Sequence, residues 1–238
     1  MLLAYARFEL RLLLRNPEQL LLVLVIPVGM LLVFGTTTVL PGTGSLDVLV
    51  PGILALAIMS SAMTGLGIAT GFQRSSRSLK RLGATPLGTR RLVLGKSLAT
   101  GSVMVMQVAV LGGVGVGIGW RPDPLGVPVA VVAVALGGAA FAGIGIGVAG
   151  VLRAEATLAA LNALYLLLLL TGGFILDTAH LPRAVAVIVA LSPATALSDA
   201  LRGSLKGVAV DSLTWLVLIV WAVAAPLLAA RVFQWDGD

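Results

Sequence analysis

Apolar positions in this chain form long uninterrupted runs, and charged residues are confined to the segments between them. Six runs of 19 to 29 residues contain no charged side chain: Leu20–Leu46, Val48–Gln73, Ser97–Trp120, Pro124–Leu152, Ala156–Leu176 and Ser212–Ala230. About 20 apolar residues in a helix, each rising 1.5 Å, cross the hydrocarbon core of a bilayer. The pattern predicts an all-α polytopic membrane protein with six transmembrane helices, at about residues 20–40, 50–72, 97–118, 127–150, 156–176 and 212–232.

Composition supports one membrane domain over residues 1–238. The chain is 58% hydrophobic and 11% charged, whereas soluble domains are about 25% charged. The predicted spans leave no room for a soluble domain. Its basic residues flank the apolar runs, which argues against nucleic-acid binding. The absence of cysteine excludes disulfides and thiolate metal sites.

Lysine and arginine are distributed unevenly between the two predicted sides of the membrane. Seven of the sixteen lie between the second and third runs, in a predicted cytoplasmic loop over residues 73–96. With the N-terminus inside, twelve lie on the cytoplasmic side and four on the outer side, the four being Arg121, Arg183, Arg202 and Lys206. The positive-inside rule therefore predicts a multi-pass membrane protein with both termini cytoplasmic.

The segment before the first span, residues 1–19, has an amphipathic pattern. Arg7, Arg11 and Arg15 recur every four residues, so they share one face of a helix, while Tyr5, Phe8 and Leu12 line another. This predicts a helix lying in the membrane interface, ended by Asn16-Pro17. The alternative is a charged lead-in that only fixes topology.

The predicted outer side contains two segments. Gly35–Pro51 is rich in glycine and proline and is predicted as the first external loop. Within residues 177–211, the charge-free run Ala184–Ser198 has only 15 residues, which favours a re-entrant hairpin over a span. A crossing there would move the C-terminus outside and stays an alternative. Four residues mark this hairpin region: Pro182, Pro193, Asp199 and Arg202.

Glycines at four-residue spacing in the third and fourth spans predict close helix packing. These pairs are Gly113 and Gly117, Gly115 and Gly119, and Gly143 and Gly147.

The sequence contains no complete motif for catalysis or nucleotide binding. Gly95-Lys96-Ser97 resembles the end of a phosphate-binding loop, but Arg90 stands where its first glycine is required. The chain has one histidine, no cysteine and no acidic pair within a span, so neither an enzyme nor a bound cofactor or metal is expected. Gln107 and Asn162 are the amides inside spans, and they either line a pathway or join helices by hydrogen bonds.

The 73–96 loop carries a more specific pattern. Ser78-Leu79-Lys80-Arg81-Leu82-Gly83-Ala84-Thr85-Pro86-Leu87, followed by Leu94-Gly95-Lys96, resembles the cytoplasmic loop of type-2 ATP-binding-cassette (ABC) transporter permeases. Leu181-Pro182, Leu191-Ser192-Pro193 and Asp199-Ala200-Leu201-Arg202-Gly203 resemble the outer segment of that family. The N-terminal arginine row and Asn16-Pro17 resemble its interfacial helix. The resemblance covers about residues 4–233. Within the family, the chain is similar to the daunorubicin-resistance type of permease.

This resemblance implies a membrane subunit that forms half of a dimeric pathway and is powered by a separate ATPase, which binds the ATP and magnesium. The implied ATPase-coupling residues are Arg77, Ser78, Leu79, Lys80, Arg81, Leu82, Ala84, Thr85, Pro86 and Leu87. Relatives usually have an acidic residue just before this motif, but positions 73–77 here contain none. The implied function is export of a drug, lipid or other amphiphile.

Two other classes of function are considered. An ion-coupled carrier normally has ionisable residues at the membrane midplane, and the six runs contain none. A non-transporting scaffold or sensor for the same ATPase would need the same loop and helices, so the sequence does not separate it from an exporter.

Overall fold

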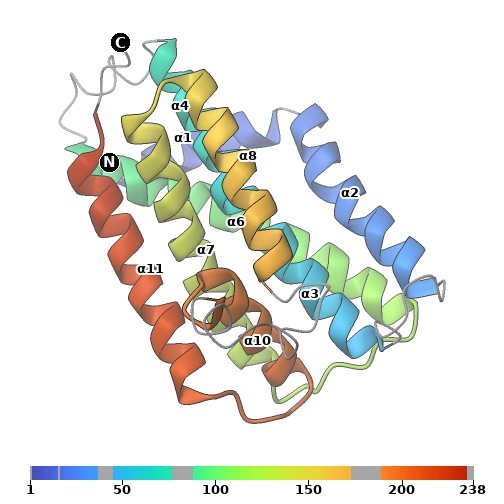
Figure 1. Ribbon diagram of the computed structural model, residues 1–238. Helices are drawn as coiled ribbons and strands as arrows, with labels where there is room; N and C mark the ends of the chain where they lie inside the picture. The colour runs from blue at the N-terminus through green and yellow to red at the C-terminus, as the bar shows by residue number, and fades with distance from the viewer. Residues whose placement is uncertain (1, 16, 37–44, 77–87, 173–188, 235–238) are drawn as a thin grey trace.

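The computed structural model describes residues 2–15, 17–36, 45–76, 88–172 and 189–234 (Figure 1). These residues are almost entirely helical, and none of them forms a strand. In chain order the elements are α1 Leu2–Leu14, α2 Pro17–Thr36, α3 Leu46–Met59, the π-helix η1 Ser60–Gly65, α4 Leu66–Ser75, α6 Gly88–Gly117, α7 Val127–Val151, α8 Ala154–Thr171, α10 Pro193–Leu205 and α11 Ser212–Val232.

Long helices run between two ends of the molecule (Figure 1). The elements α3, η1 and α4 form one continuous rod, Leu46–Ser75, which with α6, α7, α8 and α11 makes five helices long and apolar enough to cross a membrane. Helix α2 is also apolar, although the part with described side chains, Val23–Thr36, is shorter. Together these findings identify a multi-pass membrane protein.

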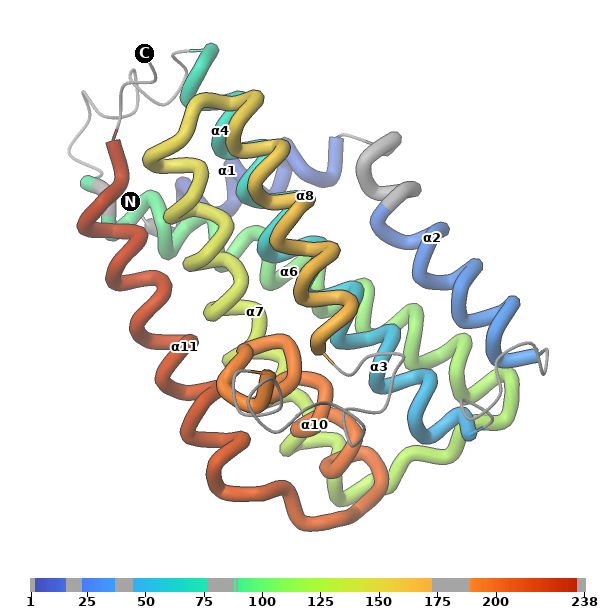
Figure 2. The backbone as a smooth tube through the Cα atoms, in the orientation of Figure 1, coloured from blue at the N-terminus to red at the C-terminus, as the bar shows by residue number. Residues whose placement is uncertain are grey.

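The short helices occupy opposite ends of the bundle. In Figures 1 and 2, α1 lies across the end where α4 finishes, and α10 lies at the other end. A hydrogen bond from Asp123 N to Leu205 O, 2.9 Å, joins α10 to the connection between α6 and α7. The two ends of the bundle are thus structurally distinct, with α1 at one and α10 at the other.

Helix α3 is at the centre of the packing. Every residue from Val50 to Met59 is buried, whereas α8 and α11 expose apolar side chains such as Leu166, Leu170, Val220 and Leu228. Exposed leucine and valine are unfavourable in water over so large an area but suit contact with lipid chains. The outer helices therefore present their apolar faces to the bilayer.

Helices α7 and α11 approach each other at glycine. A Cβ atom added at Gly143 would overlap the backbone of Ala225 and Pro226, and one at Gly147 would touch Ala229. The predicted close packing is confirmed for this pair. At Gly113 and Gly117 an added Cβ would meet nothing within 4 Å, so this pair does not bring two described helices of the chain into close contact.

The predicted first external loop is too long. Helix α3 begins at Leu46, so Pro51 and Gly52 are buried inside a helix. Ser45 starts this helix early, because its side chain accepts a hydrogen bond from Asp47 N at 3.2 Å. Pro51 has no N–H to donate to the carbonyl of Asp47, so this helix forgoes one backbone hydrogen bond there.

The cytoplasmic loop is shorter than the predicted 73–96. Helix α4 continues to Ser75, and α6 begins at Gly88 and runs unbroken to Gly117. The last part of the predicted loop and the third predicted span are thus one helix of 30 residues. In the hairpin region, α10 extends through Asp199 and Arg202, beyond the charge-free run.

Candidate functional site

Four side chains from three helices meet at the end of the bundle where α1 lies. Lys96 on α6 donates from Nζ to Glu9 Oε1 on α1 at 3.0 Å and to Gln73 Oε1 on α4 at 2.5 Å. Tyr5, one helical turn before Glu9, donates its hydroxyl to the same Glu9 oxygen at 2.5 Å. We call Tyr5, Glu9, Gln73 and Lys96 the polar cluster.

The polar cluster is shielded from solvent. Lys96 is 1% exposed, Glu9 4% and Tyr5 6%. The Tyr5 ring packs against Gly95, where a Cβ atom would overlap it. Burial, and then the neighbouring carboxylate of Glu9, raise the pKa of Tyr5 well above its ordinary range. The phenol therefore stays protonated and donates a hydrogen bond to Glu9. A buried carboxylate with two donors is compensated, whereas a single buried charge would not be.

A second buried contact joins α4 to α7. The Arg74 guanidinium is 4% exposed, and its Nη1 donates to the carbonyl oxygen of Ala149 at 2.9 Å. Arg74 and Lys96 were both predicted as cations of the loop over residues 73–96, but they lie within the helices α4 and α6. Their positions within α4 and α6 direct them into the helix packing, while Arg90 and Arg91 are exposed.

These contacts hold both ends of the segment 77–87. Gln73 and Arg74 lie just before it and Lys96 lies on the helix that follows it. The ten predicted coupling residues, Arg77 to Leu82 and Ala84 to Leu87, lie outside the described residues. The predicted interfacial row is exposed, with Arg7 and Arg11 on α1 and Arg15 directly after it.

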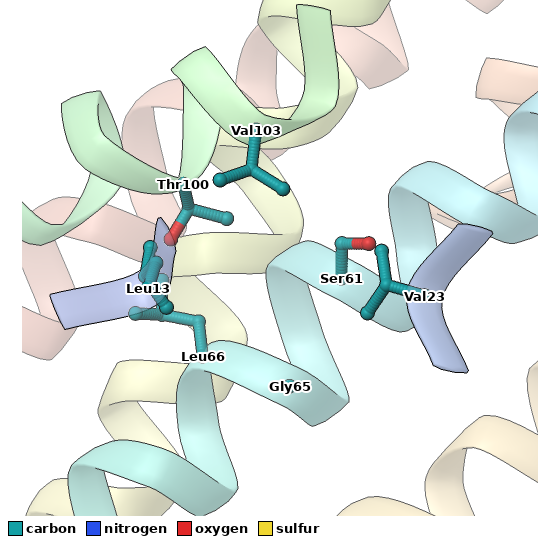
Figure 3. Close-up of a pocket in the computed structure, with 7 residues that line it drawn as sticks. All are labelled: Leu13, Val23, Ser61, Gly65, Leu66, Thr100 and Val103. Carbon is teal, nitrogen blue, oxygen red and sulfur yellow. The ribbon is translucent and has the colours of Figure 1, made fainter. Parts of the chain in front are cut away.

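A small pocket lies between α1, α2, η1, α4 and α6 (Figure 3). Leu13, Val23, Leu66 and Val103 give it a mainly apolar wall, and Ser61 and Thr100 supply hydroxyl groups. Its volume is about 30 Å³. A water needs at least about 10–15 Å³, so this pocket holds one or two waters and no larger ligand.

A larger cavity of about 270 Å³ lies between α2, α3, η1, α6 and α8. Its lining is largely apolar and includes Ile26, Met30, Ile53 and Leu56, with five neutral polar residues among them. These are Ser60, Thr64, Gln107, Asn162 and Tyr165. None of the described residues in its wall is charged, so the cavity suits an apolar ligand with uncharged hydrogen-bonding groups.

Gln107 joins three helices at the edge of this cavity. It is 1% exposed, accepts a hydrogen bond from Ser61 Oγ at 2.9 Å, and donates from Nε2 to Val23 O at 2.9 Å. Both ends of its amide are therefore engaged in packing α2, η1 and α6 together.

The other polar groups of the cavity have hydrogen-bonding capacity left. Thr64 Oγ1 is buried without a partner, and Asn162 is exposed on α8 and makes no hydrogen bond to a described residue. Ser60 and Thr64 are on η1, and π-helical turns are frequent at functional sites. Gln107 thus serves packing, while Asn162 and Thr64 are the groups able to meet a ligand.

The outer hairpin residues are described in part. Pro193 begins α10 behind the capping side chain of Ser192, Asp199 is exposed, and Arg202 is half-buried one turn later. Desolvation by neighbouring elements raises the pKa of Asp199, and the positive charge of Arg202 opposes that rise. Pro182 lies outside the described residues.

Several contributing residues were not predicted from the sequence, namely Glu9, Gln73, Ser61 and Thr64. One available signal was the spacing of Tyr5 and Glu9, which places an acid on the same helix face as a buried aromatic residue. The partner Lys96 lies 87 positions away in sequence, a separation that no local pattern reveals.

The family model for the ABC-2 type transporter matches residues 2–205. This match covers most of the chain, so the protein belongs to the ABC-2 type transporter family and is a permease component of an ABC transporter. No curated protein matches the chain.

Proposed function

We propose that this chain is the membrane subunit of a type-2 ABC exporter that carries a drug, lipid or other amphiphile across a bacterial plasma membrane. Two such subunits form the pathway, and a separate ATPase supplies the energy. The observation that carries this proposal is the polar cluster, since it joins α1, α4 and α6, and α4 and α6 are the helices that precede and follow residues 77–87 in the sequence.

The mechanism follows from these attachments. An ATPase bound to residues 77–87 displaces α4 and α6 together, because a hydrogen bond between Lys96 and Gln73 joins these two helices. Glu9 passes the same displacement to α1. Helix α4 continues through η1 into α3, so the motion reaches Ser60 and Thr64 in the cavity wall. The usual acid ahead of the coupling motif is absent, and the one acid of the polar cluster, Glu9, is buried and paired with Lys96.

The 270 Å³ cavity supports a dimeric pathway for an uncharged part of the substrate. Pockets that bind drug-sized ligands generally have volumes of about 300–1,000 Å³, and this cavity lies just below that range. A pathway that joined the cavities of two copies would fall within it. In this arrangement the chain crosses the membrane six times, residues 177–211 form an outer hairpin, and both termini are cytoplasmic.

The test is copurification of the ATPase with a tagged permease from its native host in mild detergent. The double variant Arg81→Glu/Leu82→Glu should lose the ATPase while still inserting in the membrane. The control is Val151→Glu/Arg153→Glu, which replaces one exposed apolar residue and one exposed cation on the same predicted side of the membrane. This control should retain the ATPase. Normal ATPase recovery with the first variant would overturn the coupling assignment.

Export is tested by reconstituting the copurified pair in liposomes. ATP-dependent movement of a fluorescent amphiphile should be reduced by Asn162→Leu, which removes a free amide from the cavity. A pair that hydrolyses ATP but moves no probe from a broad set of amphiphiles would favour the scaffold alternative.

A further inference from the structure

An apolar groove of about 250 Å³ lies between α6, α7 and α10, away from the cavity described above. Val108 and Gly112 on α6, Val131 on α7 and Leu201 and Leu205 on α10 contribute to its wall. Polar atoms make up very little of this wall. The groove is open toward the bilayer, since Val131, at its edge, is 59% exposed.

Glycine keeps this groove open. A Cβ atom added at Gly112 or Gly113 would meet nothing within 4 Å, so no protein side chain fills the space beside α6. These residues lie inside a candidate membrane span. An apolar cavity in the hydrocarbon region does not hold water, so a hydrocarbon chain is the occupant that fits its chemistry.

Two cations lie at the end of the groove. Arg121 follows Trp120 and precedes Pro122, both of which line it, and Lys206 follows Leu205. The hydrogen bond from Asp123 N to Leu205 O, 2.9 Å, brings these two segments together. Arg121 and Lys206 are exposed, and neither makes an ion pair with a described residue.

The nearby acids are engaged in local backbone contacts. Asp123 Oδ1 accepts from Leu125 N at 3.2 Å, and Asp211 Oδ1 accepts from Leu213 N at 3.3 Å at the start of α11. Arg121 and Lys206 thus remain available to an anionic group from the membrane. They are also two of the four cations on the predicted outer side, where the positive-inside rule disfavours them.

We propose that this groove is a phospholipid site, in which one acyl chain lies against Gly112 and the anionic headgroup phosphate contacts Arg121 and Lys206. The lipid comes from the leaflet on the α10 side. Its chain occupies the groove that α6, α7 and α10 leave between them. The site is separate from the transport cavity, and its occupancy does not depend on an ATPase partner.

The experiment measures lipid retention on the purified full chain by native mass spectrometry, with dioleoyl phosphatidylglycerol and dioleoyl phosphatidylcholine as probes. The wild type should prefer the anionic lipid. Arg121→Gln/Lys206→Gln should weaken phosphatidylglycerol binding by about fivefold for each cation removed and remove the preference. The control Arg153→Gln/Arg231→Gln removes two exposed cations from the opposite end and should change nothing.

A second variant tests the groove itself. Gly112→Leu fills it and should reduce binding of both lipids, whereas Gly101→Leu adds the same side chain elsewhere on α6, also where a Cβ meets nothing within 4 Å. Equal lipid retention by Gly112→Leu and Gly101→Leu would overturn the proposal. A loss of self-association by Gly112→Leu without lipid loss would also overturn it, since a second copy would then cover the groove.

Discussion

At Glu9 and Lys96, two opposite charges lie 3.0 Å apart with almost no exposure to solvent. Removing one partner leaves the other buried and uncompensated, which costs about 3–5 kcal/mol. Lys96→Met should therefore lower the free energy of unfolding by about 3 kcal/mol or more, measured by denaturant titration in detergent. Glu9→Gln/Lys96→Met, which removes both charges, should recover much of this loss.

The control for that measurement is Arg90→Met. Arg90 is on the same helix, but its side chain is exposed, and the change should stay within about 0.5 kcal/mol. Equal effects of Lys96→Met and Arg90→Met would mean that the buried ion pair adds nothing to stability.

The hydroxyl of Tyr5 makes a separate contribution. Tyr5→Phe removes its bond to Glu9, so it should cost about 2 kcal/mol, as is typical of bonds to a charged group. Because the pKa of Tyr5 is raised in the folded protein, the unfolded chain loses the phenol proton first once the pH exceeds 10.0. The stability advantage of the wild type over Tyr5→Phe is therefore fully present below that pH and should shrink above it.

Unfolding titrations of both proteins at pH 7 and at successive values above 10 measure this difference. A gap that widens with pH would show that the folded protein favours the phenolate, against the contacts described for Tyr5.

The sequence predicts which residues are charged but not where each charge points. Lys96 and Arg74 were counted among the loop cations because they border apolar runs. Burial was not predictable, since it depends on Glu9 and on the carbonyl of Ala149, which lie 87 and 75 positions away. Gln107 was predictable as an interhelical group by its position in a span, although its partners were not.

Among the elements, the packing of α7 on α11 depends on a residue without a side chain. At Gly143 the neighbour is the backbone of Pro226, which cannot move aside as a flexible side chain can. Gly143→Val should lower the free energy of unfolding by about 1–3 kcal/mol, the usual cost of overpacking. The midpoint of thermal or denaturant unfolding measures it.

Gly117→Val is the matched control, because a Cβ at that glycine meets nothing within 4 Å. It should have a much smaller effect. Equal destabilisation of the two variants would mean that replacing a helical glycine is itself the cause. The close contact between α7 and α11 would then not explain the effect at Gly143.

Element positions follow from hydrophobic runs better than element ends do. The run Val48–Gln73 lies within the rod Leu46–Ser75, but proline and glycine suggested a loop as far as Pro51. The cap at Ser45 outweighed that local signal. The π-helical turn Ser60–Gly65 was not predictable either, since its residues fit an ordinary helix equally well and neighbouring helices select the wider turn.

For the whole molecule, the uneven distribution of cations predicted two different faces. The structure has two distinct ends, with α1 at one and α10 at the other (Figure 2). The orientation of these two ends in the membrane is predicted from the count of lysine and arginine alone. An accessibility measurement is therefore needed to relate the two ends to the two sides.

For that accessibility measurement, the end of α7 near residue 150 shows which other helix ends lie on the same side of the bundle. Gln234 N donates to Gly150 O at 3.0 Å, and Arg74 donates to the adjacent carbonyl of Ala149 at 2.9 Å. The end of α11 and the end of α4 therefore lie on one side, whereas Val208, 62% exposed beside α10, lies at the opposite end.

Because the chain contains no cysteine, single cysteines report their own accessibility without further substitution. Ser76→Cys and Gln234→Cys should react with a membrane-impermeant maleimide only when the cytoplasmic side is open, and Val208→Cys should react in intact cells. Labelling of Ser76→Cys but not Gln234→Cys from the cytoplasm would mean that the hairpin region crosses the membrane. Such a crossing would separate α11 from α4, so it would contradict the shared contacts of both helices at Ala149 and Gly150.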